Sequence, residues 1–125
     1  VCLVGDGGFL MTGSELATAV QYGARVRLFV ANNGSYGTIR LHQEKQFPGR
    51  VAGTTLTNPD FAALARAYGA HAETVARTAE FAPAFERALK ADRPTLLELR
   101  VDKDAISHRV TLSELRAAAE KKAGK

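Results

Sequence analysis

Strand-like apolar runs alternate with helix-like segments along the chain, and this alternation constrains the fold most strongly. The strand-like runs cover residues 1–4, 26–31, 71–75 and 95–101. Between them, apolar residues recur at helical spacing, so the order is strand, helix, strand, loop, helix, strand, helix, strand, helix. This order predicts an α/β fold with three layers, αβα, in which right-handed crossovers build a doubly wound, mostly parallel sheet.

Local signals predict where helices begin. Residues 12–15 and 111–114 have the spacing of a capping box, in which a hydroxyl and a carboxylate satisfy the first backbone N–H groups of a helix. The run Asn58-Pro59-Asp60 is expected to begin a helix over residues 61–68. The segment from Gln46 to Asn58 reads as a long loop, and loops of that length are usually functional or mobile.

Composition fits one folded domain and excludes several classes of function. Hydrophobic residues make up 46% of the chain, but no run is long enough to span a membrane, and the start does not resemble a signal peptide. The only cysteine, Cys2, reads as a small buried residue of a strand, which suits a reducing cytoplasm. The net charge of +4 is mild; its basic residues are scattered, with a small cluster at Lys121, Lys122 and Lys125. We therefore expect a cytoplasmic protein that binds neither nucleic acid nor membrane.

Polar motifs follow the first two strands at the point where each ends. Gly5-Asp6-Gly7 comes after the first strand, and Asn32-Asn33 comes after the second. Parallel strands end at the same edge of a sheet, and open α/β sheets bind ligands at that edge. The side chains of Asp6 and Asn33 are therefore expected to meet there.

The donors expected at this edge are all oxygens. Asp6 supplies a carboxylate, Asn33 a carboxamide oxygen, and Ser35 most plausibly a backbone carbonyl. Such donors suit Mg²⁺ or Ca²⁺ rather than zinc. They are too few to hold Mg²⁺ alone, so phosphate oxygens and water must complete the octahedron. The metal site thus implies a phosphorylated ligand.

Backbone N–H groups close by could bind that phosphate. The candidates are those of Gly7, Gly8 and the turn Ser35–Gly37. A helix beginning near Tyr36 would add its positive end. Together these groups predict a clamp for a diphosphate.

These motifs resemble the signature of thiamine-diphosphate-dependent enzymes. The runs Gly5–Ala19 and Asn32–Gly37 are similar to the acetolactate synthase and benzoylformate decarboxylase group. The similarity continues through Asn58–Ala62 and the strand at Thr95–Val101, so it covers nearly the whole chain. The resemblance implies a thiamine-diphosphate-binding domain of an enzyme that decarboxylates 2-oxo acids or transfers their acyl groups, a lyase or transferase.

The resemblance also implies roles for individual residues. Asp6 and Asn33 would bind Mg²⁺ through their side chains, and Ser35 through its carbonyl oxygen. The residues that would line the diphosphate are Gly7, Gly8, Tyr36 and Gly37. Many relatives carry a serine where Gly8 stands, so one phosphate contact would be weaker here.

Parts of such an enzyme are not in residues 1–125. In the family, a first strand and helix precede the Gly-Asp-Gly motif, and the glutamate that activates the cofactor comes from a separate domain, usually of a neighbouring subunit. We therefore expect residues 1–125 to be a truncated carboxyl-terminal domain with no catalytic residue of its own, inactive in isolation. The parent is expected to be a homodimer or homotetramer. The missing strand should leave an apolar sheet edge exposed.

Other interpretations stay open at this point. A non-catalytic α/β module serving assembly or regulation could keep the same clamp. An unrelated Rossmann-like nucleotide-binding domain is a further alternative, although Leu10 occupies the last glycine position of the dinucleotide motif. His42 is expected to be an exposed polar residue, and Tyr36 either contacts the cofactor or packs in its turn.

Overall fold

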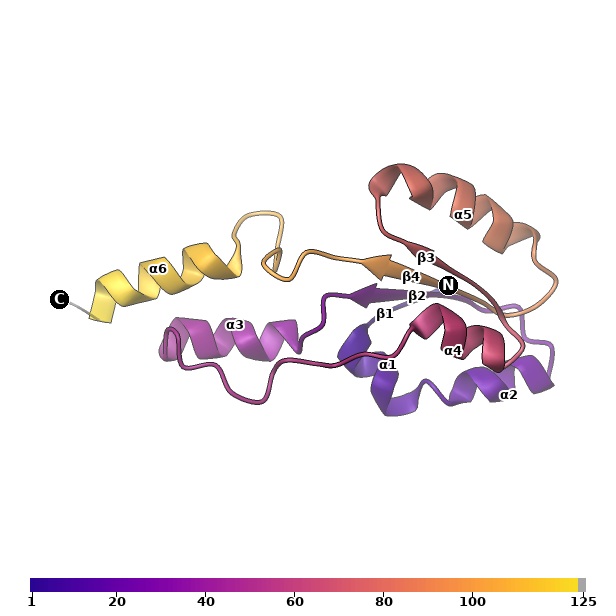
Figure 1. Cartoon of the computed structure of the whole chain (residues 1–125), viewed down its shortest axis with the longest axis horizontal. Helices are drawn as coiled ribbons and strands as arrows, with labels where there is room; N and C mark the ends of the chain where they lie inside the picture. The colour runs from indigo at the N-terminus through magenta and orange to yellow at the C-terminus, as the bar shows by residue number, and fades with distance from the viewer. Residues whose placement is uncertain (124–125) are drawn as a thin grey trace. The chain divides into compact units, whose positions relative to one another are not determined.

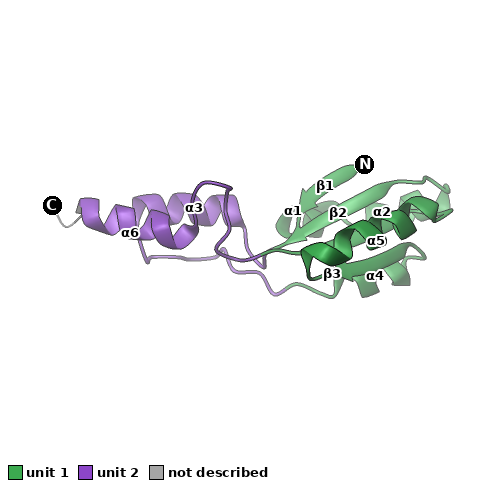
Figure 2. Ribbon diagram, turned by 90° about the horizontal axis from the view of Figure 1, so that it is seen from above, with its two compact units in different colours: residues 1–32, 58–101 green, residues 33–57, 102–125 purple. Residues whose placement is uncertain are grey.

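The chain forms two compact units, which are described separately. The computed structural model describes residues 1–123, so Lys125 of the basic cluster lies outside the described residues. Unit 1 comprises Val1–Asn32 and Asn58–Val101, and unit 2 comprises Asn33–Thr57 and the described residues from Asp102 onward (Figure 2).

Unit 1 contains a parallel four-stranded sheet. Its strands are β1 (Cys2–Gly5), β2 (Arg27–Asn32), β3 (His71–Val75) and β4 (Thr95–Arg100). They are ordered β1-β2-β4-β3, and every pair of neighbours is parallel. The register places Val30 between Val4 and Glu98, and Thr74 on the other side of Glu98. Glu98 therefore lies in the middle of the sheet.

Helices cover both faces of this sheet. One face carries α1 (Asp6–Thr12), α2 (Glu15–Gln21) and α4 (Phe61–Ala67), and the other carries α5 (Thr78–Lys90) (Figure 1). Because successive strand residues point to opposite faces, Val30 and Leu96 join the α4 side while Phe29 and Leu97 join the α5 side. The predicted three-layer αβα fold with a parallel, doubly wound sheet is confirmed.

The first expected capping box is wrong. Helix α1 begins at Asp6, directly after β1, so Thr12 is the last residue of a helix rather than the start of one. Helix α2 follows Ser14, whose side chain makes no capping hydrogen bond. The reason is that the glycine motif itself turns from strand into helix, which the capping pattern could not reveal.

Two other helix starts are confirmed. Before α6 (Leu112–Ala123), the Glu114 N–H donates to Thr111 Oγ1 at 3.2 Å, and the Thr111 N–H donates to Glu114 Oε2 at 2.8 Å. Before α4, Asp60 Oδ1 accepts a hydrogen bond from the Ala63 N–H at 2.8 Å. Helix α4 ends before Gly69, whose φ of 93° favours glycine.

Cys2 is exposed, so its expected burial is wrong. The reason is its place on β1, the edge strand of the described sheet, where Leu3 is also 71% exposed. An apolar pocket of about 270 Å³ lies next to β1 and is lined in part by Cys2, Val4 and Phe9. The described sheet therefore has the apolar edge that the sequence led us to expect.

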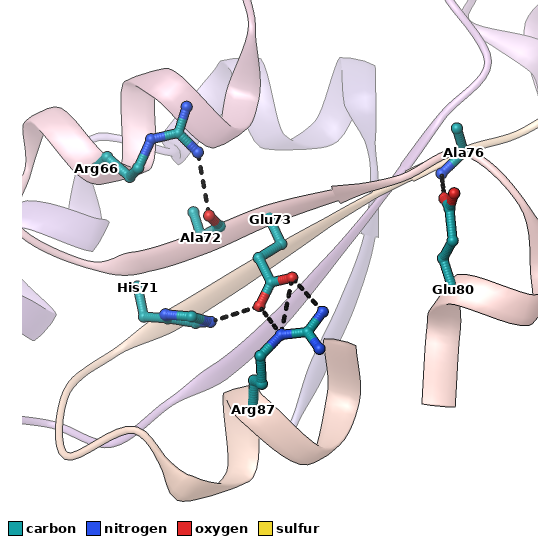
Figure 3. Close-up of polar contacts among 7 residues, drawn as sticks. All are labelled: Arg66, His71, Ala72, Glu73, Ala76, Glu80 and Arg87. Atoms are coloured by element: carbon teal, nitrogen blue, oxygen red, sulfur yellow. Dashed lines mark hydrogen bonds and ion pairs between the residues drawn. The ribbon is translucent and has the colours of Figure 1, made fainter. Parts of the chain in front are cut away.

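An ion pair between Arg87 and Glu73 links α5 to β3 (Figure 3). Arg87 donates to both carboxylate oxygens of Glu73, through Nε at 2.9 Å and Nη2 at 2.6 Å. The Nε2 atom of His71 lies 3.0 Å from the same carboxylate. The hydrogen bond from Arg87 holds the pKa of Glu73 below its ordinary value. The contact is one link between the sheet and the helix that covers its second face.

Unit 2 contains α3 (Gly37–Gln46), α6 and the loop over residues 47–57. Arg116 on α6 pairs with the buried carboxylate of Glu44 on α3. His42 on α3 is exposed, as expected. Each helix in the described part of the chain is too short or too polar to cross a membrane.

Candidate functional site

Asp6 is a buried carboxylate at the carboxyl end of β1. It is the first residue of α1 and only 2% exposed. Its Oδ1 accepts a hydrogen bond from the Gly7 N–H at 2.9 Å, and its Oδ2 accepts one from Asn58 Nδ2 at 2.7 Å. Two neutral donors thus hold this charge in place inside the fold.

Asn58 connects Asp6 to the end of the next strand. Its Nδ2 also donates to Asn32 Oδ1 at 2.8 Å. Asn32 is the last residue of β2 and is 6% exposed. Its own Nδ2 donates to Glu98 Oε1 at 2.6 Å. A continuous chain of hydrogen bonds therefore links Asp6 on one side of β2 to Glu98 on the other.

Glu98 is completely buried in the centre of β4. Its Oε2 accepts a hydrogen bond from Thr74 Oγ1 of β3 at 3.0 Å. Arg100 Nη2, on a half-exposed side chain, lies 3.1 Å from Glu98 Oε1. We call Asp6, Asn58, Asn32, Glu98 and Thr74 the edge network, because it runs from the carboxyl end of β1 across β2 and β4 to β3.

Unit 2 holds the other predicted metal ligands. Asn33 Oδ1 accepts a hydrogen bond from the Ser35 N–H at 3.1 Å, and Ser35 is 6% exposed. Gly37 makes room for this turn: a Cβ atom there would meet Asn33 Nδ2 at 3.0 Å and Ile106 Cδ1 at 3.1 Å. The local fold therefore sets the position of the Asn33 amide. Tyr36 is the residue directly before α3.

The loop over residues 47–57 is bound to the same turn. The Tyr36 N–H donates to the Thr54 carbonyl at 2.9 Å, and the Leu56 N–H donates to the Gly34 carbonyl at 2.9 Å. Gln43 Nε2 of α3 donates to the carbonyl of Ala52 at 2.8 Å. The long loop predicted from the sequence is thus anchored at several points within unit 2.

Three of the backbone donors proposed for phosphate already have partners within the chain. The Gly7 N–H donates to Asp6, the Ser35 N–H to Asn33, and the Tyr36 N–H to the Thr54 carbonyl. Phosphate binding by these groups would require an exchange of partners. At Gly8, an added Cβ would meet Val4 Cγ2 at 3.0 Å, so the serine expected in relatives would fit here only if Val4 shifted slightly.

The predicted site residues are divided between the units. Asp6, Gly7 and Gly8 lie together in unit 1, and the second set lies together in unit 2 and consists of Asn33, Ser35, Tyr36 and Gly37. Binding of one ion by both sets stays a prediction. Sequence reasoning missed the part played by Asn58 and Glu98. A signal for Glu98 was present, because this charged residue stands between Leu97 and Leu99 in a central strand.

The donor chemistry fits a hard cation with a phosphorylated ligand. Among the described residues, no group of three or more His, Cys, Asp and Glu side chains could hold a metal ion. An ion at this edge would therefore also need amide, carbonyl and ligand oxygens, as Mg²⁺ often has. In the described chain Asn58 Oδ1 is buried without a hydrogen-bond partner, so it could accept a bond from a ligand or its water shell beside Asp6.

The fold and the site define an α/β ligand-binding domain with its polar groups at the carboxyl edge of a parallel sheet. The family described as "Thiamine pyrophosphate enzyme, C-terminal TPP binding domain" matches residues 1–99. The chain belongs to this family, and the resemblance drawn from the motifs is confirmed.

Known relatives agree with this membership. The chain is 36% identical over 103 residues to the acetolactate synthase isozyme 2 large subunit of Escherichia coli, covering 82% of the chain and 19% of that protein. It is 37% identical over 105 residues to 3D-(3,5/4)-trihydroxycyclohexane-1,2-dione hydrolase of Bacillus licheniformis, covering 79% and 16%. The structure of the thiamine diphosphate-dependent 4-hydroxybenzoylformate decarboxylase of Rhodococcus jostii matches with a TM-score of 0.76 and 37% identity, covering 82% and 19%. The chain therefore spans less than a fifth of the length of each of these relatives.

Proposed function

We propose that this chain binds the diphosphate of thiamine diphosphate through Mg²⁺, as part of an acetolactate synthase-like enzyme that decarboxylates 2-oxo acids or transfers their acyl groups. The observation that carries the proposal is the buried carboxylate of Asp6 at the carboxyl end of β1. Asp6 already accepts hydrogen bonds from Gly7 and Asn58 inside the fold, and a bound cation would add an opposite charge beside its carboxylate. Family membership supports thiamine diphosphate as the ligand.

The chain's own residues would hold and orient the cofactor. Asp6 and Asn33 would bind the metal through side-chain oxygens, and Ser35 through its carbonyl oxygen. Burial of Asp6 and Ser35 keeps water away from these donors and strengthens their attraction to a cation. The bound cofactor would supply the electron sink that the reaction needs.

Four further residues would surround the diphosphate: Gly7, Gly8, Tyr36 and Gly37. In this proposal the N–H groups of Gly7 and Tyr36 exchange their present acceptors for phosphate oxygens. Gly37 would contribute by leaving space, since a side chain there would press on Asn33. None of these residues is proposed to act on the substrate itself.

The relatives support a wider proposal for the parent protein. We propose that residues 1–125 form part of the carboxyl-terminal domain of a lyase or transferase, with its other domains elsewhere in the parent. Catalytic activity would then require those domains, and the isolated chain would be inactive. The proposal includes a cytoplasmic homodimer or homotetramer with a 2-oxo acid as substrate. An unrelated Rossmann-like domain is not supported, because the chain matches a thiamine pyrophosphate family.

Titration with Mg²⁺ tests the metal site directly. In the full-length parent enzyme at saturating thiamine diphosphate, Asp6→Asn should weaken Mg²⁺ binding by about a hundredfold or more, because the amide carries no charge. The matched control is Asp92→Asn, which neutralises a carboxylate on a side chain that is 76% exposed and should leave the affinity unchanged. Isothermal calorimetry measures both. An unchanged affinity in the Asp6 variant would refute the assignment.

A further inference from the structure

We propose that Glu98 is a positioning residue that orients the Asp6 carboxylate through the side-chain amides of Asn32 and Asn58. The inference rests on the function proposed for Asp6 and adds a residue that does not touch the ion. Glu98 lies in β4, whereas Asp6 is the first residue of α1, directly after β1. The hydrogen bonds between them pass through two amides in succession.

The charge of Glu98 decides which way each amide faces. A carboxylate only accepts hydrogen bonds, so it requires the Nδ2 group of Asn32 to face it. Asn32 Oδ1 must then face Asn58, and it accepts from Asn58 Nδ2 at 2.8 Å. The remaining N–H of the same Asn58 group points to Asp6 Oδ2 at 2.7 Å. Reversal of either amide would place oxygen against oxygen.

Burial makes this orientation rigid. Glu98 is fully buried, and Asn32 is 6% exposed, so water cannot readily replace their bonds. Thr74 donates to Glu98 Oε2 at 3.0 Å, and Arg100 Nη2 lies 3.1 Å from Oε1, the oxygen that also accepts from Asn32. The carboxylate therefore has a fixed place from which its effect passes to Asn58. One oxygen of Asp6 is held by Asn58 and the other by the Gly7 N–H, which fixes the plane of the carboxylate.

Residues that orient metal ligands typically contribute a factor of about 10 to 100 in metal affinity. In the full-length enzyme at saturating thiamine diphosphate, Glu98→Met should therefore weaken Mg²⁺ binding by about tenfold. Glu98→Gln keeps an oxygen toward Asn32, and Thr74 can accept from its new N–H group. This variant should retain Mg²⁺ affinity within about threefold of the wild type, because only the charge assistance is lost.

A double-mutant cycle tests whether Glu98 acts through Asn58. Asn58→Ala should also weaken Mg²⁺ binding, and the combination with Glu98→Met should be no weaker than Asn58→Ala alone. Losses that add in full would overturn the proposal, since Glu98 would then act by another route. A shared loss supports it.

Variants of unchanged shape keep the test decisive if Glu98→Met does not fold. Asn32→Asp places a carboxylate against Glu98 and should weaken Mg²⁺ binding. Adding Glu98→Gln restores a donor toward residue 32 and should recover most of the affinity, because the new Asp side chain can still accept from Asn58. Failure of this rescue would count against the relay.

Two further variants separate the possible outcomes. Arg87→Ala removes an ion pair with Glu73 that lies outside the edge network, so it should lower the melting temperature and leave Mg²⁺ affinity unchanged. Asp6→Asn separates this inference from the proposed function. If Asp6→Asn leaves Mg²⁺ binding intact, the metal site itself is wrong. If Asp6→Asn weakens binding while Glu98→Met lowers only the melting temperature, Glu98 is purely structural and this inference alone fails.

Discussion

Arg116 on α6 donates hydrogen bonds from Nε and Nη2 to the carboxylate of Glu44 on α3, which is completely buried. The Gly49 N–H donates to the same carboxylate at 3.0 Å. The hydrogen bond from Arg116 is the main reason that the pKa of Glu44 falls from 4.5 to about 2. One side chain thus joins two helices and the beginning of the loop over residues 47–57.

The protein should become less stable in acid, because the stabilisation from this ion pair is lost there. Because the pKa of Glu44 is lower when folded than when unfolded, its contribution is present above pH 4.5 and is lost as the pH falls toward 2. Glu44→Gln should lower the free energy of unfolding by about 2 kcal/mol at neutral pH, because Arg116, 40% exposed, can still be solvated by water. Urea unfolding at several pH values should show this difference shrinking below pH 4.5. Glu86→Gln, at an exposed position, serves as the control, and a difference independent of pH would contradict the prediction.

Gly37→Ala should disturb the candidate metal ligand Asn33. The new methyl group would lie 3.0 Å from Asn33 Nδ2 and 3.1 Å from Ile106 Cδ1, closer than side chains normally pack. We expect about 1 kcal/mol of destabilisation and roughly tenfold weaker Mg²⁺ binding in the full-length enzyme. Gly5→Ala is the matched control, because a Cβ there meets nothing within 4 Å and its φ of −74° suits alanine. Equal effects of the two substitutions would argue against a steric cause.

The pair Glu73–Arg87 should contribute only modestly to stability. The carboxylate is 25% exposed and the guanidinium 54% exposed, so solvent screens their attraction. Arg87→Ala should lower the free energy of unfolding by roughly 0.5–1 kcal/mol, and less in high salt. Arg77→Ala, on a side chain that is 80% exposed, should cost less still. Denaturant unfolding at low and high ionic strength checks both, and a loss unaffected by salt would point to packing instead.

Asp60→Ala should destabilise α4 by about 1 kcal/mol, because the carboxylate accepts a hydrogen bond from a first-turn N–H of the helix. Thermal unfolding measures the effect. Asp60→Asn keeps an accepting oxygen and should recover most of the loss. If both variants lost the same stability, the charge rather than the cap would be responsible.

Sequence reasoning predicted the framework well, because it depends on local patterns. The four strands and the helix order follow from periodicity, and β3 begins and ends where expected, at His71 and Val75. The helix starts at Asp60 and Thr111 follow from capping residues. The start of α1 at Asp6 was not predicted, because a glycine-rich segment can adopt several backbone conformations.

The remaining features depend on contacts between distant parts of the chain. Asn58 reaches Asp6 across 52 positions, and Glu98 reaches Asn32 across 66, so no local pattern encodes these bonds. The exposure of Cys2 likewise depends on which strand lies at the sheet edge, not on the residues around it. Beyond the motifs that contain Asp6 and Asn32, the charged Glu98 between two leucines was the visible sign of the edge network.

The loop over residues 47–57 forms backbone hydrogen bonds with the turn that contains Ser35, on either side of that residue. If Ser35 binds the metal as proposed, the same turn would hold both this loop and the ion. If the loop moved away from the turn, the Ser35 carbonyl would be held less firmly and would bind the ion less tightly. Loss of the ion would in turn weaken the binding of the loop to the turn. Binding of the cofactor and ordering of the loop would then be coupled and would occur together.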